Sequence, residues 1–497
     1  MDSAEAPTDQ PGTIVKLFGI DLRTLALFRV TVALVLLYNL AMRSADISSL
    51  FTDEGAAPIV TAQNFCGDAW CYSLHFLDGS AEFQVLLFVV SALCAVTLCL
   101  GYRSRLSTIG SWILFVSLNN RVPSIITGGD VLLSMALFWG MFLPLGARWS
   151  ADARRGQIEP ANDCELSIAT LAVLLQIFWM YWSTGLWKLN EVWLEGRALQ
   201  VVFTDDMLVR PLGELLLEFP GLLVVLTYIV LVIELVAPFL LFSPWRTNLV
   251  RSVTIAVLAG MHVGIELTMT VMIFSFASLA ALTLFIPGMW WDRGPLHRVA
   301  GRFDRKLRPL RRKPKSRPAV AAAAGSWLPD GILRVVQIFF LIYVPVFNML
   351  SPLEPRRASP GFRAFNRVGE LIGAAQVWKM FDRPPGENRF VARATFVGGG
   401  PEKDIFRNER TSDPPRRPET RMALSTARWM LFVRQTARDS ARCFRPTLTR
   451  YYARRWNDRA APDQQILELE LYFYPSPHES EKLARTGRPL WRMNTAN

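Results

Sequence analysis

The sequence predicts an all-α polytopic membrane bundle followed by a small C-terminal α+β domain outside the membrane. Hydrophobic residues make up 51% of the 497-residue chain, which contains 16 tryptophans and 31 phenylalanines. Nearly uncharged runs recur, many of about 18 residues or more, which is long enough to cross a hydrocarbon core ~30 Å thick. These runs lack the two-residue alternation of barrel strands, so helices are the structure that satisfies their backbone groups in lipid.

We predict about nine transmembrane helices, of which the third and fourth are short. In chain order they are Leu22–Met42, Phe83–Leu100, Leu106–Leu118, Val131–Leu145, Leu166–Trp187, Leu222–Phe242, Val250–Leu267, Met269–Ile286 and Ile332–Leu350. The segment before Leu22 contains acidic residues and no basic cluster, which is not typical of a cleaved signal peptide. The first helix is therefore expected to stay in the protein.

Lysine and arginine collect in alternate loops, and this pattern predicts the orientation in the cell membrane. Basic residues follow the second, fourth and sixth spans, and eleven more lie between Arg293 and Arg317. Such loops stay in the cytoplasm, so we expect a cytoplasmic N-terminus and an extracytoplasmic C-terminal domain. The net charge of +12 is then mainly a topology signal. The basic loop also suits anionic membrane lipid, whereas its proline- and alanine-rich end resembles a linker, so we expect no nucleic acid partner.

The expected organisation has four parts. They are a transmembrane domain at 1–290, a basic cytoplasmic loop at 291–330, a last transmembrane helix at 331–351 and the extracytoplasmic domain at 352–497. In the last part, residues 390–397 and 466–473 alternate as strands do, and residues 422–444 are expected to form a helix with Trp429, Phe432 and Val433 on one side.

Cysteine and histidine usage predicts no metal site. The chain has six cysteines and four histidines, without CxxC or HExxH spacing. Cys66 and Cys71 share the first outer loop and, with Cys443, are the cysteines expected in an oxidising compartment. Such a compartment favours disulfide formation among these three cysteines.

Ionisable residues inside apolar spans are costly in lipid and usually have a partner or a function. Arg29 and Glu234 lie ~10 and ~12 Å from the inner ends of their spans, so we predict that they form a structural ion pair. His262 lies ~18 Å from the inner end of its span, where a hydrogen bond across helices is the simpler role. Asp130 opens the fourth span, and a role as the helix N-cap is enough to explain an acidic residue there.

Lys188 ends the fifth span with Tyr181, Thr184 and Glu191 on its helical stripe. Such an amine is either an anchor at the membrane interface or a desolvated base. Because Tyr181 lies ~21 Å from the inner end, close to the depth of His262, we predict one chamber in the outer half of the bundle. We expect this chamber to be lined by Lys188, His262, Asp130 and Tyr181. Trp193 is expected to lie in the interfacial aromatic belt.

The stretch from Tyr181 to Gly196 resembles the segment of vitamin K-dependent gamma-carboxylase that carries its catalytic lysine, and Lys188 falls on that lysine. Other stretches resemble the bacterial relatives of that enzyme, the horizontally transferred transmembrane domain (HTTM) family. They are Ala26-Leu27-Phe28-Arg29, Thr52-Asp53-Glu54-Gly55, the Gly-Gly-Asp and Phe-Leu-Pro-Leu-Gly motifs within 128–152, Glu234–Trp245 and His262–Trp291. The resemblance covers residues 17–290. The neighbouring lysine of the carboxylase motif is Trp187 here, and its histidine ahead of the fourth span is Asp130.

The resemblance implies a carboxylase-type lyase that works with a reduced naphthoquinone of the vitamin K type and uses Lys188 as a base. It also implies a lipid-soluble cofactor and a protein or peptide substrate on the outer side. On this basis the expected catalytic residues are Lys188, His262 and Asp130, and the expected cofactor contacts are Tyr181, Thr184 and Trp187. The residues themselves leave open a non-catalytic transporter or assembly subunit on the same bundle, although no inverted repeat is visible.

Overall fold

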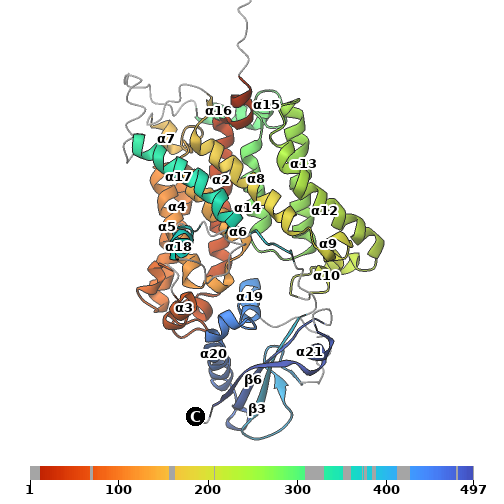
Figure 1. Cartoon of the computed structure of the whole chain (residues 1–497). Coiled ribbons are helices and arrows are strands. Elements are labelled where there is room, and N and C mark those ends of the chain that lie inside the picture. The colour runs from red at the N-terminus through yellow and green to blue at the C-terminus, as the bar shows by residue number, and fades with distance from the viewer. Residues whose placement is uncertain are drawn as a thin grey trace, which may run out of the picture.

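The computed structural model describes residues 12–67, 71–155, 163–205, 207–307, 330–350, 360–371, 373, 378–382, 388–410, 426–476 and 480–495. Figure 1 shows a bundle of long helices with a small domain of strands and helices at one end. The first helix, α1 (Thr13–Phe18), lies at the opposite end of the bundle.

Each of the nine predicted spans contains a helix. These helices are α2 (Leu22–Ser44), α4 (Ala81–Leu100), α5 (Ser104–Arg121), α6 (Gly128–Gly140), α8 (Ile168–Trp187), α12 (Pro220–Leu240), α13 (Thr247–Thr268), α14 (Phe274–Leu282) and α17 (Asp330–Leu350). Within the described residues, α2, α4, α8, α12 and α13 are long and apolar enough to cross a membrane. The other four are shorter or less apolar, so length and composition support five crossings rather than nine.

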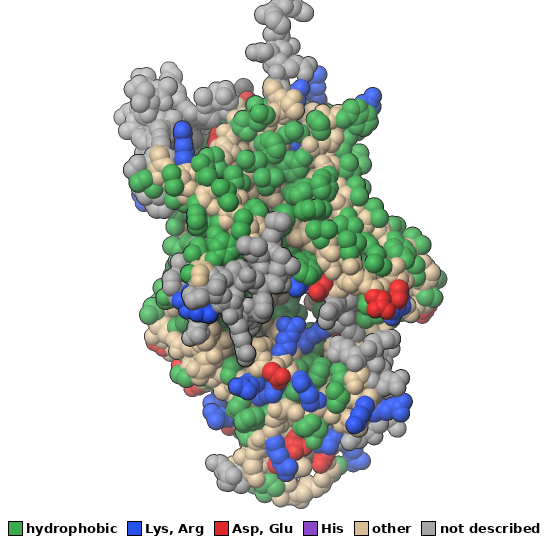
Figure 2. All heavy atoms as spheres, viewed as in Figure 1, with side chains coloured by type: hydrophobic (Ala, Val, Ile, Leu, Met, Phe, Trp, Pro, Cys, Tyr) green, Lys and Arg blue, Asp and Glu red, His purple; other side chains and the backbone are tan. Residues whose placement is uncertain are grey.

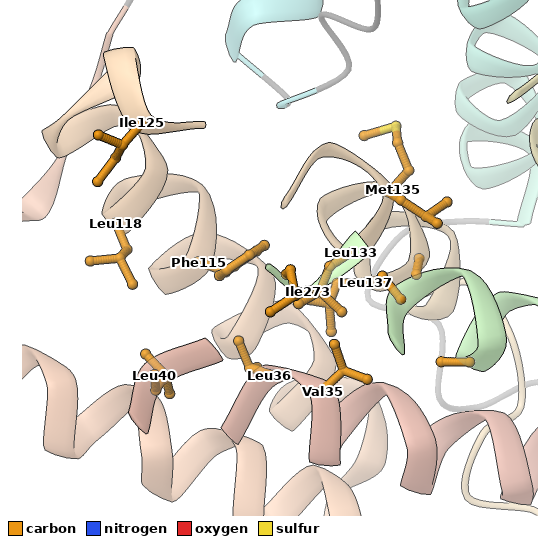
Figure 3. Packing of buried hydrophobic residues seen from close by; sticks show 14 of the residues in the cluster. Val35, Leu36, Leu40, Phe115, Leu118, Ile125, Leu133, Met135, Leu137 and Ile273 are labelled. Carbon is orange, nitrogen blue, oxygen red and sulfur yellow. The ribbon is translucent and has the colours of Figure 1, made fainter. Parts of the chain in front are cut away.

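The two shortest of these helices, α6 and α14, lie inside the bundle. They have 13 and 9 residues, and α14 packs against both α6 and α2. At ~1.5 Å per residue, neither is as long as a ~30 Å hydrocarbon core. Figure 3 shows Val35 and Leu36 of α2, Phe115 of α5 and Leu133 of α6 close together in this core. These short helices were predicted as spans because a fully buried helix is as apolar as a membrane helix.

Apolar side chains also cover the outside of the bundle. The outward faces of α4, α12 and α13 expose large hydrophobic residues such as Leu86, Val225 and Val253. Figure 2 shows hydrophobic side chains spread over one face of the bundle, with charged groups more frequent on the end domain. Such a continuous apolar surface indicates that the bundle is embedded in a membrane.

Shorter elements connect the long helices. They are α3 (Ile59–Cys66), α7 (Ala151–Arg154), α9 (Glu191–Leu194), α10 (Ala198–Phe203), α11 (Pro211–Leu216), α15 (Gly288–Asp292), α16 (His297–Leu307), α18 (Pro360–Leu371) and the paired strands β1 (Ile20–Asp21) and β2 (Cys164–Glu165). The structure contains the disulfide that was expected in the first outer loop, between Cys66 and Cys71. Cys443, the third cysteine expected on that side, has a free thiol.

The end domain is built on an antiparallel sheet with strand order β5-β4-β3-β6-β7. Its elements are β3 (Arg389–Phe396), β4 (Lys403–Asp404), β5 (Glu409–Arg410), α19 (Ala427–Gln435), α20 (Arg445–Asn457), β6 (Ile466–Tyr474), α21 (Glu481–Thr486) and β7 (Arg488–Asn494). Phe390 pairs with Phe473, so the two predicted strands are confirmed as neighbours.

The helix predicted over 422–444 is shorter in the structure. It begins at Ala427 and ends at Gln435, and a separate 3₁₀ segment covers Asp439–Phe444. Thr436 closes the helix, because its hydroxyl donates to the carbonyl of Val433. Trp429, Phe432 and Val433 are buried on one side, as predicted. Residues 422–425 lie outside the described part of the chain.

The basic segments and the end domain occupy opposite ends of the molecule. Figure 1 shows α7, α15 and α16 at the end that carries the chain's N-terminal helix, and α3, α19 and α20 at the other. The linker-like stretch at 314–324 lies outside the described residues. This separation agrees with the collection of lysine and arginine in alternate loops of the sequence.

Candidate functional site

Lys188 is buried and forms an ion pair with Glu234. It follows the last residue of α8, and its backbone is still helical. Its Nζ lies 2.5 and 2.6 Å from the two carboxylate oxygens of Glu234 on α12. Lys188 is 4% exposed and Glu234 5% exposed, so the pair is shielded from water. A residue that anchors a helix at the interface would instead hold its amine in the polar boundary.

A glycine lets the two helices approach closely enough for this pair. A Cβ atom on Gly185 would lie 3.0 Å from the side chain of Leu235 and 3.2 Å from the carbonyl carbon of Glu234. Any larger residue there would push α8 away from α12. Because Gly185 lies one turn before Lys188, it holds the backbone of the pair in place.

Trp193 packs against the amine of the ion pair. The Lys188 amine lies 4.8 Å from the centroid of its indole ring, which is a cation–π distance. Trp193 is 2% exposed, so the prediction that it belongs to an interfacial belt is wrong. This role could not be predicted, because the sequence around a buried tryptophan resembles that around an interfacial tryptophan in a membrane protein.

A short segment at 378–382, which we call the strap, covers this region. The carbonyl of Phe381 accepts from the indole of Trp193 at 2.7 Å, and that of Asp382 accepts from Asn190 at 2.8 Å. The Lys379 amine lies 3.8 Å from the ring centroid of Trp187. Trp187 thus contacts the strap. Its predicted contact with a cofactor stays a prediction.

Tyr181 and His262 form a second buried pair on the same side of α8. The Tyr181 hydroxyl lies 2.7 Å from Nε2 of His262, which is on α13. Within the described residues, Nδ1 of His262 has no hydrogen-bond partner. Tyr181 and Lys188 are seven residues apart, so they lie on one helix face, two turns from each other. Thr184, between them, donates to the carbonyl of Met180.

Asp130 belongs to a different cluster from Lys188. Its carboxylate accepts hydrogen bonds from Asn39, Arg43 and Arg428 and from the backbone and hydroxyl of Thr127. The bonds with Thr127 form a capping box at the start of α6, in which Thr127 is the N-cap residue and Asp130 is the third helical residue. Asp130 thus helps to cap the helix, although it is not the N-cap residue that the sequence predicted. The structure does not bring Asp130 into the group formed by Lys188, Tyr181 and His262. With its acceptor oxygens held by two arginines, its expected catalytic role is not supported.

Asp130 also joins the end domain to the bundle. Arg428 comes from α19 of the end domain and is 4% exposed. Next to it, the Thr426 hydroxyl donates to Asp46 at 2.7 Å, and Arg434 pairs with Asp205 at 2.8 Å. Burial raises the pKa of the Asp46 carboxyl, and the bond from Thr426 opposes that rise. The end domain is thus fixed by several buried polar contacts.

The predicted ion pair between Arg29 and Glu234 is wrong. Arg29 donates to the carbonyls of Leu145 and Trp149, each at 2.7 Å. These carbonyls lie in the turns after α6, beyond the helix, where they need donors from elsewhere. Arg29 therefore holds a loop at the basic end, while the carboxylate of Glu234 is bound by Lys188. Matching depth alone did not identify the partner.

The central arrangement can move protons. An ammonium and a carboxylate 2.5 Å apart can become a neutral amine and a neutral acid by transfer of one proton along the hydrogen bond. The tyrosine and histidine beside them can donate and accept in the same way. Groups of three or more histidine, cysteine or acidic residues that would hold a metal are not found among the described residues.

A comparison with known protein families gives a match. The family model of the HTTM domain matches residues 19–290, which is more than half of the chain, and this range includes Lys188, Glu234, Tyr181 and His262. No solved structure matches the chain. The apolar helices and the family match lead to one conclusion: the chain is a membrane protein of the HTTM family.

Proposed function

We propose that the protein is a quinol-linked membrane enzyme of the gamma-carboxylase type, with Lys188 as its base. The observation that carries the proposal is the buried pair of Lys188 and Glu234, because it places an amine and a proton acceptor together away from water. Tyr181, on the same face of α8 as Lys188, and His262 of α13 supply further acid–base groups.

Two features near Lys188 support a reduced naphthoquinone as the cofactor. Trp193 lies against the amine, and Nδ1 of His262 is a buried polar atom without a partner among the described residues. Aromatic rings and a few directed polar atoms are typical of sites for flat cofactors. When bound, a reduced naphthoquinone would supply the electrons for a reaction with oxygen that yields a strong base.

In this proposal Lys188 starts the reaction. Its ammonium gives a proton to Glu234, which leaves a neutral amine whose lone pair can accept the proton of an acidic hydroxyl. The amine becomes an ammonium again in that step, and its positive charge stabilises the anion that forms. Trp193 and the strap keep water away, so the electrostatic interaction stays strong.

The test is turnover by the purified full-length protein. With reduced menaquinone and oxygen, we expect naphthoquinone epoxide, detected by mass spectrometry. Lys188→Arg keeps the charge but does not release a proton, so epoxide formation should fall by about 10²–10⁴-fold while the melting temperature changes little. Exposed Lys482→Arg is the matched control and should keep full activity. No epoxide from the wild-type protein, or equal amounts from Lys188→Arg, would contradict the proposal.

We also infer that the end domain is extracytoplasmic and that the basic end is cytoplasmic. The support is the basic character of α16, which carries Arg298, Arg302 and Arg305, at the end of the bundle opposite the end domain. A disulfide between Cys66 and Cys71 on the side of the end domain agrees with an oxidising compartment there.

Cysteine labelling in intact cells tests this orientation. In a chain whose four free cysteines are replaced by serine, Asp458→Cys should react with an impermeant maleimide. Arg305→Cys should react only after the membrane is permeabilised. Both positions are exposed in the structure, so access within the protein does not limit either reaction. Labelling of both sites in intact cells would place the two ends on the same side and overturn the orientation.

A further inference from the structure

A cavity of about 650 Å³ lies where the bundle meets the end domain, apart from Lys188. One wall is the π-helical turn Ile47–Phe51 after α2, and the other is formed by α19 and α20. Its most prominent lining residues are Trp429, Tyr451, Tyr452, Arg455, Trp456 and Arg459, and we call this site the interdomain cleft. The volume is within the range of sites for small molecules, about 300–1,000 Å³.

The aromatic walls of the interdomain cleft are held in place by their own contacts. The indole of Trp429 donates to the Tyr452 hydroxyl at 2.7 Å, and that of Trp456 donates to the carbonyl of Gln464 at 3.0 Å. Phe406 meets Tyr452 edge-on, with ring centroids 5.0 Å apart. Because these polar edges are bonded to the protein, the accessible parts of the Trp456 and Tyr451 rings in the cleft are apolar surface against which a flat ligand can pack.

Two arginines give the interdomain cleft a positive charge. One nitrogen of Arg455 donates to the Tyr451 hydroxyl at 2.9 Å, which orients its guanidinium. Within the described residues, neither Arg455 nor Arg459 forms an ion pair, and both are exposed. The nearby carboxylate of Asp404 is already paired with Arg407 at 2.6 Å. Guanidinium groups bind carboxylates and phosphates through paired hydrogen bonds.

We propose that the interdomain cleft binds an anionic ligand that carries a flat ring, with its acidic group on Arg455 and Arg459 and its ring against Trp456 and Tyr451. The acidic group is a carboxylate or a phosphate, from a soluble compound or from a lipid headgroup at the membrane surface. This site is independent of the reaction proposed at Lys188, since it uses residues of the end domain.

The experiment uses 1-naphthyl phosphate as a fluorescent probe and the full-length protein in nanodiscs of neutral lipid. We expect saturable binding by anisotropy, with Arg459→Gln and Trp456→Leu each raising the Kd about tenfold, as for the loss of one charge-assisted or stacking contact. Arg450→Gln, an exposed arginine of the same helix outside the cleft lining, is the matched control and should bind as the wild type does.

Two further measurements separate the outcomes. If the natural acid belongs to a lipid headgroup, phosphatidylglycerol in the nanodiscs should compete with the probe; if it is soluble, the Kd should stay the same. Either result agrees with the site. Equal binding of uncharged 1-naphthol, or an unchanged Kd in Arg459→Gln with an unchanged melting temperature, would overturn the proposal.

Discussion

Lys188→Ala and Glu234→Ala should each lower the free energy of unfolding in detergent by about 3–5 kcal/mol. Each change leaves one buried charge without its partner, between helices where water does not replace the lost hydrogen bonds. Replacing both with apolar residues of similar size, as in Lys188→Met with Glu234→Leu, removes both charges and should recover most of the lost stability. Thermal melts of the single and double variants measure this coupling.

The exposed pair Glu195–Arg197 is the matched control for this cycle. It lies a few residues after Lys188, and its side chains are about half exposed. Arg197→Ala should therefore change stability by less than ~1 kcal/mol. If losses from Lys188→Ala and Glu234→Ala are additive, the two residues do not act as a pair. The apolar double variant also separates folding from chemistry, since it should fold well and make no epoxide.

The sequence identified both members of this pair but not their pairing, because the two helices do not begin and end at the same level. A Cβ on Gly185, one turn before Lys188, would lie 3.2 Å from the carbonyl carbon of Glu234, so the end of α8 lies beside an inner turn of α12. A depth counted from the inner end of each span assumes that all spans start at one level, and it therefore placed Glu234 beside Arg29.

Local patterns predicted much of the rest. Apolar runs located nine helices, although α6 and α14 show that a run as apolar as a membrane span can be a buried short helix. Alternation located β3 and β6, and helical spacing of apolar residues located the buried face of α19. The contacts that complete each site come from distant segments. Phe381 binds Trp193 and Arg428 binds Asp130 across 188 and 298 residues of sequence, and no local pattern indicates such pairings.

Asp130→Ala should loosen the end domain from the bundle and cost about 3–5 kcal/mol of stability. The substitution leaves the guanidinium groups of Arg43 and Arg428 buried without the carboxylate that bonds both. It also removes the capping box of α6, worth ~1 kcal/mol more. Limited trypsin digestion should then cut the end domain faster, and the melting temperature should fall.

A second change in the same cluster distinguishes the effect of charge from that of hydrogen bonding. In Asp130→Asn with Arg428→Met, one carboxylate and one guanidinium are removed together, so the remaining charge is lower than in Asp130→Asn alone. We expect the double variant to melt above Asp130→Asn, because only Arg43 then lacks a charged partner at this site. Arg450→Met, on the exposed face of α20, should leave melting unchanged. If Asp130→Asn digests and melts like the wild type, hydrogen bonding rather than charge holds the end domain, since an asparagine keeps part of the bonds but none of the charge.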